Sequence, residues 1–230
     1  FFTRPMKIWE KESHKIVFDV GIRRSSQNSQ VQLWLWDHDI SASLVIESAL
    51  DAHSDIRQVL RYMEWSLHGI PWIVASSISL TIMMRLNSNS ELTHKFAILL
   101  FGLCIDLVCV GIIKVFVRRP RPVYDRQDQV YEAAIADRFS FPSGHSSRSA
   151  MLAVLALSLC SPPDWIVTVL KIFPFLLGLS RVVMGRHYIS DVLAGLTLGW
   201  LEGHIVQLLP QSAIPFLKRS CTTLFGTSRP

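Results

Sequence analysis

The stretch FAILLFGLCIDLVCVGIIKVFV, residues 96–117, has only two charged side chains, Asp106 and Lys114. A helix that rises about 1.5 Å per residue would extend roughly 33 Å over this stretch, enough to cross the hydrocarbon layer of a membrane. Half of the 230 residues are hydrophobic, and the mean hydropathy is +0.31. Because the hydrophobic residues gather in runs, the sequence predicts an all-α membrane protein.

Four further apolar runs lie on either side of this stretch. They are residues 67–84, 143–160, 164–179 and 190–209. With residues 96–117 they predict a polytopic bundle of about five transmembrane helices. Pro174 predicts a kink in the fourth helix, because proline removes a helical hydrogen bond. Asp106 should face the interior of the bundle, since an acid exposed to lipid is costly.

The sequence divides into four parts. In order, they are a polar N-terminal tail (residues 1–30), an interfacial region (31–63), a membrane-embedded domain that holds the predicted bundle (64–210) and a C-terminal tail (211–230). In the interfacial region apolar side chains recur at helical spacing, but several acids interrupt them. We therefore expect an amphipathic helix lying at the membrane surface, anchored by Trp34 and Trp36. A short soluble helix and a span over residues 40–62 are the alternatives.

Three short motifs lie beside the apolar runs. Their residues are Lys114, Arg121 and Pro122; Pro142, Ser143, Gly144 and His145; and Ser180, Arg181, His187 and Asp191. Each motif alone has an ordinary explanation: a lysine that snorkels from a helix end, a turn with a helix cap, or a surface His–Asp pair. Together, each next to a hydrophobic segment, they indicate a functional site. Since successive spans alternate in direction, the three motifs should meet at one face of the membrane.

The cations of these motifs suit a phosphate group. Arginine can hold two phosphate oxygens at once, as Arg121 and Arg181 would, and Lys114 adds a point charge. Ser143 and Gly144 open a helix, so their backbone N–H groups would add an anion site at its N-terminus. These residues are therefore predicted to bind the phosphate of a substrate.

The two histidines suit the transfer of that phosphate. His187 and Asp191 are four residues apart, so one helical face can carry both. The aspartate can fix the tautomer of His187, whose other nitrogen is then free to attack phosphorus. His145 would protonate the leaving oxygen and later activate water. The acids of the loop at residues 118–141 are too dispersed to argue for magnesium, so we expect no metal and no other cofactor.

Composition and charge narrow the possible partners. The net charge of +5 suits anionic lipid headgroups and a phosphate substrate. No basic stripe with interleaved aromatic residues is present, so nucleic acid is not an expected partner. The four cysteines show neither zinc spacing nor a disulfide framework. The expected partners are therefore a lipid phosphate or diphosphate substrate and the lipids of the membrane.

The three motifs resemble those of the type-2 phosphatidic acid phosphatase superfamily, also called lipid phosphate phosphatases. Every defining position is matched, and the resemblance covers residues 65–209. It implies a helical bundle and a metal-independent dephosphorylation through a phosphohistidine. It also implies that His187 is the nucleophile, Asp191 its partner and His145 the acid and base. The phosphate ligands that it implies are Lys114, Arg121, Ser143, Gly144 and Arg181.

Finer features are similar to the polyisoprenoid (presqualene) diphosphate phosphatase branch of that superfamily. They are EWSLHGIPW at residues 64–72, the pair Arg118-Arg119, and LSRV at residues 179–182. The similarity implies a presqualene, farnesyl or geranylgeranyl type of diphosphate, or a related phospholipid phosphate, as substrate. It also implies residence in the endoplasmic reticulum and nuclear envelope. The chain departs from the family in one respect, because many members have six spans and we expect five.

Other classes of protein fit the sequence less well. A catalytically silent membrane scaffold of the same fold would lack a motif histidine or cation, and none is missing. A transporter would explain Asp106 but not a His–Asp pair with three cations. A soluble vanadate-dependent haloperoxidase has similar motifs, but the apolar runs argue against it.

The distribution of Lys and Arg predicts the orientation in the membrane. Residues 1–62 and the loop at 118–141 are rich in both, whereas the opposite loops hold little beyond Arg85 and Lys95. With five spans these two basic segments lie on the same side, and such an excess marks the cytoplasmic side. We therefore expect a site that faces the cytosol. A span over residues 40–62 would place it in the lumen instead.

Overall fold

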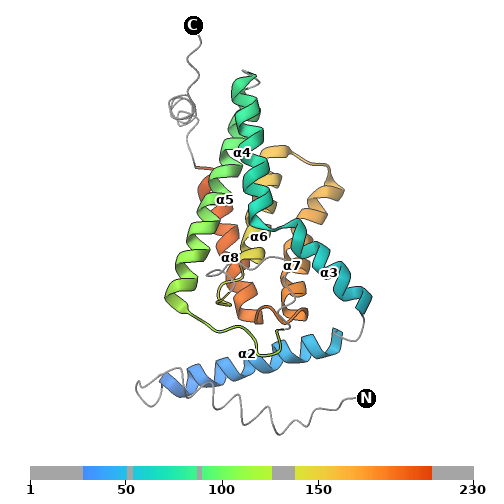
Figure 1. Ribbon diagram of the computed structural model, residues 1–230, viewed down its shortest axis with the longest axis vertical. Coiled ribbons are helices and arrows are strands. Elements are labelled where there is room, and N and C mark those ends of the chain that lie inside the picture. The colour runs from blue at the N-terminus through green and yellow to red at the C-terminus, as the bar shows by residue number, and fades with distance from the viewer. Residues whose placement is uncertain (1–27, 51–53, 87–89, 126–137, 209–230) are drawn as a thin grey trace. The chain divides into compact units, whose positions relative to one another are not determined.

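The computed structural model describes residues 28–50, 54–86, 90–125 and 138–208, which form helices and their connections (Figure 1). The helices are α2 (Asn28–Leu50), α3 (Ser54–Ser66), α4 (Gly69–Arg85), α5 (Ser90–Val117), α6 (Gly144–Cys160), α7 (Asp164–Val183) and α8 (Ile189–Val206). No strand occurs in these ranges, so the predicted all-α class is confirmed. Most of the predicted N-terminal tail, the C-terminal tail and the middle of the loop at 118–141 lie outside the described residues.

The chain forms two compact units, residues 1–41 and 42–230, and α2 runs across the boundary between them. In the first unit the described residues are the first part of α2. In the second unit α6 contacts α5, α7 and α8, while α4 packs against α5 (Figure 1). Because α6 has three helical neighbours, side chains at its first turn are enclosed by the bundle.

Each predicted span corresponds to a helix, with shifted ends. The helices α4, α6 and α8 begin and end within three residues of the predicted positions. Helix α5 begins at Ser90 instead of residue 96, and a Glu91–Lys95 ion pair of 2.7 Å joins its first two turns. Helix α7 ends at Val183 instead of residue 179, because Ser180 and Arg181 are buried in the bundle rather than solvated in a loop.

Three described stretches are long and apolar enough to cross a membrane. They are Arg57–Arg85, Glu91–Val117 and Asp164–Val183. Helices α6 and α8, with 17 and 18 residues, are not among them, and both carry buried polar side chains. The chain is therefore an integral membrane protein, while the number of five spans stays a prediction.

The interfacial region contains two helices, α2 and α3, instead of the single helix predicted for residues 31–63. Only α3 has a strong amphipathic pattern; in α2 the apolar and polar residues are distributed around the helix. Ser43 of α2 is fully buried, and its hydroxyl oxygen accepts a hydrogen bond of 3.0 Å from the backbone N–H of Ile189. The second half of α2 thus supports the start of α8.

Two glycines one turn apart let α8 pack closely against α6. A Cβ atom at Gly199 would collide with the backbone carbonyl of Ser147, and one at Gly195 with that of Ser143. Small residues at this spacing are typical of membrane helices whose backbones approach each other. The close approach brings the first turns of α6 and α8 together, where the Ser143 N–H donates to the carbonyl oxygen of Asp191 over 3.0 Å.

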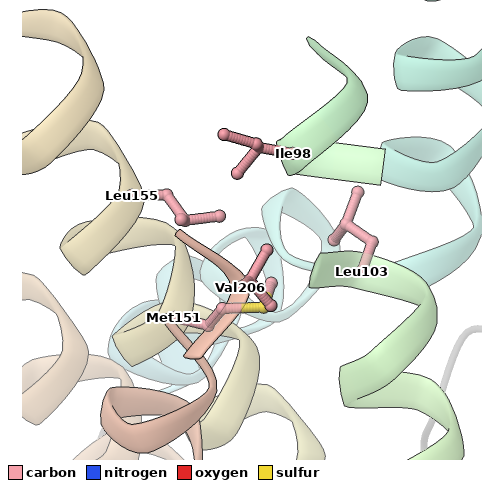
Figure 2. Close-up of a cluster of buried hydrophobic side chains, with 5 residues drawn as sticks. All are labelled: Ile98, Leu103, Met151, Leu155 and Val206. Atoms are coloured by element: carbon pink, nitrogen blue, oxygen red, sulfur yellow. The ribbon is translucent and has the colours of Figure 1, made fainter. Parts of the chain in front are cut away.

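A small apolar cluster joins α5, α6 and α8 (Figure 2). Its buried members are Ile98, Leu103, Met151, Leu155 and Val206. Because Met151 follows the first two turns of α6, this cluster lies beyond the polar start of that helix. It holds the three helices together while leaving the starts of α6 and α8 to polar residues.

The interior of the bundle also contains charged side chains. Asp106 is fully buried, as predicted, and lies 2.9 Å from a guanidinium nitrogen of Arg148. Arg148 also donates to the carbonyl oxygen of Leu67, and the Ser147 hydroxyl donates to Glu202 over 3.2 Å. Pairing of this kind is required because an isolated charge inside a membrane protein is costly.

The glycine contact predicts a stability difference between two alanine substitutions. Gly199→Ala should lower the free energy of unfolding by about 1–3 kcal/mol, because the added methyl group meets the Ser147 carbonyl. Gly111→Ala is the matched control, since no atom lies within 4 Å of its Cβ position. Thermal unfolding in detergent, followed by tryptophan fluorescence, measures both. Equal melting temperatures would contradict close α6–α8 packing.

Candidate active site

The predicted site residues lie at the ends of four helices. They are Lys114 (last turn of α5), Arg121 (the loop after it), Ser143 to His145 (start of α6), Arg181 (last turn of α7), His187 (the α7–α8 connection) and Asp191 (first turn of α8). Lys114, Arg181 and His187 are each at most 4% exposed. Ion pairs and hydrogen bonds connect these ends into one polar cluster.

The carboxylate of Asp191 accepts hydrogen bonds from Arg119 and Tyr188 and lies near His187. Its Oδ1 accepts a hydrogen bond of 2.6 Å from Arg119, and its Oδ2 accepts one of 2.9 Å from the backbone N–H of Tyr188. The same Oδ2 lies 3.7 Å from Nδ1 of His187. That distance exceeds a hydrogen bond, although such contacts often tighten when a substrate binds. Asp191 therefore faces Nδ1 and leaves Nε2 as the nitrogen available for chemistry.

The surroundings of His187 keep its ring neutral. Burial is the largest cause and lowers its pKa; Asp191 raises the pKa, while Arg121 and Lys114 lower it, so that it reaches about 4. At neutral pH the imidazole therefore lacks its second proton. A neutral ring has the free electron pair that a nucleophile needs.

Ser143 caps the helix that begins with Gly144. Its hydroxyl oxygen accepts hydrogen bonds from the backbone N–H and the hydroxyl of Ser146, at 3.4 and 2.9 Å. Its own N–H donates to the carbonyl of Asp191. The close packing of α6 on α8 thus gives this N–H a backbone partner, and the anion site predicted for Ser143 and Gly144 stays a prediction. Gly144 keeps its predicted place at the N-terminus of the helix.

The three predicted phosphate-binding cations are each fixed by a neighbour. Lys114 donates through Nζ to the carbonyl oxygen of Phe139 over 2.7 Å. Arg181 lies 2.9 Å from a carboxylate oxygen of Glu64, and Arg121 lies 3.4 Å from Asp125. Phosphate oxygens could therefore be bound by donors whose side chains are already held in place.

His145 lies in the first turn of α6, opposite a second histidine. Its ring meets that of His68 edge-on, with the ring centroids 6.5 Å apart. Its Nε2 is buried and has no hydrogen-bond partner among the described residues. The structure thus places His68, next to the start of α4, beside His145, whereas the sequence predicted only His145 and His187 at the site.

Sequence reasoning assigned no site role to four charged residues of this cluster: Arg119, Arg186, Glu64 and Asp125. Arg119 binds Asp191, Arg186 lies 3.6 Å from Glu64, and Asp125 lies 3.4 Å from Arg121. The two arginines had a local signal, because each lies within two residues of a predicted site residue, Arg121 or His187. Glu64 had only its place in the stretch 64–72, since its arginine partners are more than 100 residues away in the sequence.

Metal-binding side chains do not gather in this cluster. In the ranges that the structure describes, no group of three or more His, Cys, Asp or Glu side chains could hold a metal ion. Positive charge is supplied by lysine and arginine. That the protein needs no metal or other cofactor remains a prediction.

Comparison with known proteins finds one family. The model of the PAP2 superfamily matches residues 95–214, which include all three motifs. A probable lipid phosphate phosphatase beta of Arabidopsis thaliana is 36% identical over 129 residues, covering 45% of this chain and 60% of the plant protein. A decaprenylphosphoryl-5-phosphoribose phosphatase of Mycobacterium tuberculosis is 25% identical, covering 73% of this chain and 88% of that protein.

A solved structure has a similar fold. The transmembrane PAP2-type phosphatidylglycerolphosphate phosphatase of Bacillus subtilis superposes with a TM-score of 0.58 at 23% identity. The superposition covers 75% of this chain and 84% of the Bacillus chain. This similarity supports the arrangement of the helices.

The surroundings of His187 predict how its pKa should respond to substitution. Arg121→Gln should raise the pKa from about 4, because it removes a nearby cation. Asp191→Asn should lower the pKa further, because it removes the carboxylate that stabilises the imidazolium. NMR titration of histidine-labelled protein in detergent measures these shifts, and His187→Gln assigns the signal. A wild-type midpoint near pH 6.5 would contradict the buried environment.

Proposed function

The chain belongs to the PAP2 superfamily, and from this membership and the site geometry we propose that it is an integral membrane lipid phosphatase. The observation that carries the proposal is the His187–Asp191 pair at the meeting point of buried cations. A neutral histidine, a fixed carboxylate and cations for phosphate are the parts that phosphoryl transfer to a nitrogen needs.

The first step of the proposed reaction transfers the phosphoryl group to the enzyme. Nε2 of His187 gives its electron pair to phosphorus, and the bond between phosphorus and the leaving oxygen breaks. His145 donates a proton to that oxygen, so that the lipid departs as an alcohol or, from a diphosphate, as a monophosphate. Lys114, Arg121 and Arg181 neutralise the negative charge of the equatorial oxygens. The product is a phosphohistidine.

The second step releases inorganic phosphate. His145, now neutral, accepts a proton from water, and the water oxygen attacks phosphorus. The bond from phosphorus to Nε2 breaks, and its electron pair returns to His187. Asp191 stabilises the positive charge that the ring of His187 carries while phosphorylated. Both histidines are then ready for another cycle.

We further propose polyisoprenoid diphosphates, of presqualene, farnesyl or geranylgeranyl type, as the substrates, with related phospholipid phosphates as the alternative. Residues 64–72, Arg118-Arg119 and residues 179–182 support this choice through their resemblance to that branch. A relative named for a decaprenylphosphoryl substrate is consistent with it. The extended apolar surface of the bundle would accommodate the lipid tail.

The proposed nucleophile can be tested by labelling. His187→Ala should abolish phosphoenzyme formation from a substrate labelled in its terminal phosphate, and lower phosphate release at least 1,000-fold. His145→Ala should slow release less for farnesyl diphosphate than for farnesyl phosphate, because the diphosphate has the better leaving group. EDTA is present throughout, since the cations are expected to replace a metal. Equal labelling of the wild type and His187→Ala would contradict the assignment.

The location is proposed to be the endoplasmic reticulum and nuclear envelope, with the active site facing the cytosol. This orientation follows from the excess of Lys and Arg in residues 1–62 and 118–141. A tag in the loop at residues 125–137 should be cleaved when protease is added to sealed microsomes. A lumenal marker protein, protected until detergent is added, is the control. Protection of the tag would mean a lumenal site.

A further inference from the structure

Five charged side chains near the site form an alternating chain of ion pairs. Their order is Arg121, Asp125, Arg186, Glu64 and Arg181. They come from three segments that are distant in the sequence: the loop after α5, helix α3, and the stretch from the end of α7 to α8. The two arginines at its ends are the ones that the proposed function assigns to phosphate.

Arg186 lies at the centre of this chain of ion pairs. One terminal nitrogen of Arg186 lies 3.1 Å from Oδ1 of Asp125, and the other lies 3.6 Å from Oε2 of Glu64. The second oxygen of each acid meets a phosphate-binding arginine: Asp125 Oδ2 lies 3.4 Å from Arg121, and Glu64 Oε1 lies 2.9 Å from Arg181. Arg186 is thus connected to both arginines, through one acid each.

Burial makes these contacts effective. Arg186 and Arg181 are each 1% exposed, and the side chains of Glu64 and Asp125 are 11% and 6% exposed. Such charges are little screened by water, and a buried charge that loses its partner is strongly destabilised. Removing an arginine from these ion pairs would therefore change the electrostatic environment of the acid that it contacts.

The distribution of charge among these ion pairs depends on Arg186. Each acid contacts Arg186 through one oxygen and a phosphate-binding arginine through the other. Without Arg186, more of the negative charge of each acid would act on Arg181 or Arg121. Both phosphate-binding arginines would then be less positive toward a substrate.

We propose that Arg186 is a positioning residue of the phosphate site, acting through Glu64 and Asp125 on Arg181 and Arg121. It shares the charge of both acids, so that the two phosphate-binding arginines remain oriented and positive toward the substrate. This inference rests on the proposed phosphatase function. It differs from a role as a direct ligand of the second phosphate of a diphosphate, because both terminal nitrogens of Arg186 already face carboxylates.

Arg186→Gln provides the main test in purified enzyme. The KM for farnesyl phosphate and for farnesyl diphosphate should each rise at least tenfold and by similar factors, as should the inhibition constant of inorganic phosphate. Arg186→Lys should recover part of the loss, since an ammonium group keeps the charge but lacks the fork that bridges two acids. Arg118→Gln is the matched control: it removes an exposed charge from the same loop as Arg121 and should change KM by less than about threefold.

A second set of variants tests the connection through the acids. Glu64→Gln alone should raise KM, because Arg181 loses its orienting partner. In the Arg186→Gln background, Glu64→Gln should add no further loss, because the acid would otherwise neutralise Arg181. Gel filtration and circular dichroism establish that each variant is folded. If Arg186→Gln does not fold, Glu64→Gln and Arg186→Lys carry the test, each with an expected rise of at least threefold in KM.

Three outcomes would overturn the inference. The first is an unchanged KM and phosphate inhibition constant in every folded variant, which would mean a purely structural role. The second is a loss confined to the diphosphate, which would make Arg186 a direct ligand of the second phosphate. The third is additive losses for Glu64→Gln and Arg186→Gln. Failure of the proposed function is separate, since the wild-type protein would then release no phosphate from either substrate.

Discussion

The hydrogen bond from the Ser143 N–H to the carbonyl oxygen of Asp191 ties the start of α6, which carries His145, to the first turn of α8, which carries Asp191. It forms because Gly195 and Gly199 let α8 approach the backbone of α6. The first turn of α8 is thereby fixed against that of α6, and the Asp191 carboxylate is fixed with it. If the helices moved apart, His187 would lose its alignment with the start of α6. The site thus depends on a packing contact between backbones.

Buried acidic side chains in this bundle are paired with arginines. Asp106 is paired with Arg148 in the interior, and Asp191 with Arg119 at the helix ends. A carboxylate that already has a cationic partner can be buried, and burial in turn prevents water from weakening the contact. The same surroundings keep His187 uncharged. A polar site can therefore persist next to apolar helices because its carboxylates, those of Asp191, Glu64 and Asp125, each have an arginine partner.

The site is assembled from helix ends. The last turns of α5 and α7 and the first turns of α6 and α8 supply most of its side chains. Helix α3, which is strongly amphipathic, adds Glu64 from outside the region covered by the family model. A helix beyond that region thus contacts Arg181, one of the arginines that we assign to phosphate.

Local patterns in the sequence determined the helices and the positions of the motifs, because run length and helical spacing act over a few turns. They also placed Asp106 inside, since an acid within an apolar run must avoid lipid. The prediction that one helical face carries both His187 and Asp191 is wrong, because α8 begins at Ile189 and His187 lies in the connection before it. The tertiary structure alone decided which charges meet. The contact of Glu64 with Arg181 and the use of the Ser143 N–H by Asp191 depend on how closely helices distant in the sequence pack. That closeness is set by side-chain volume and glycine positions on both helices, which no single stretch of sequence specifies.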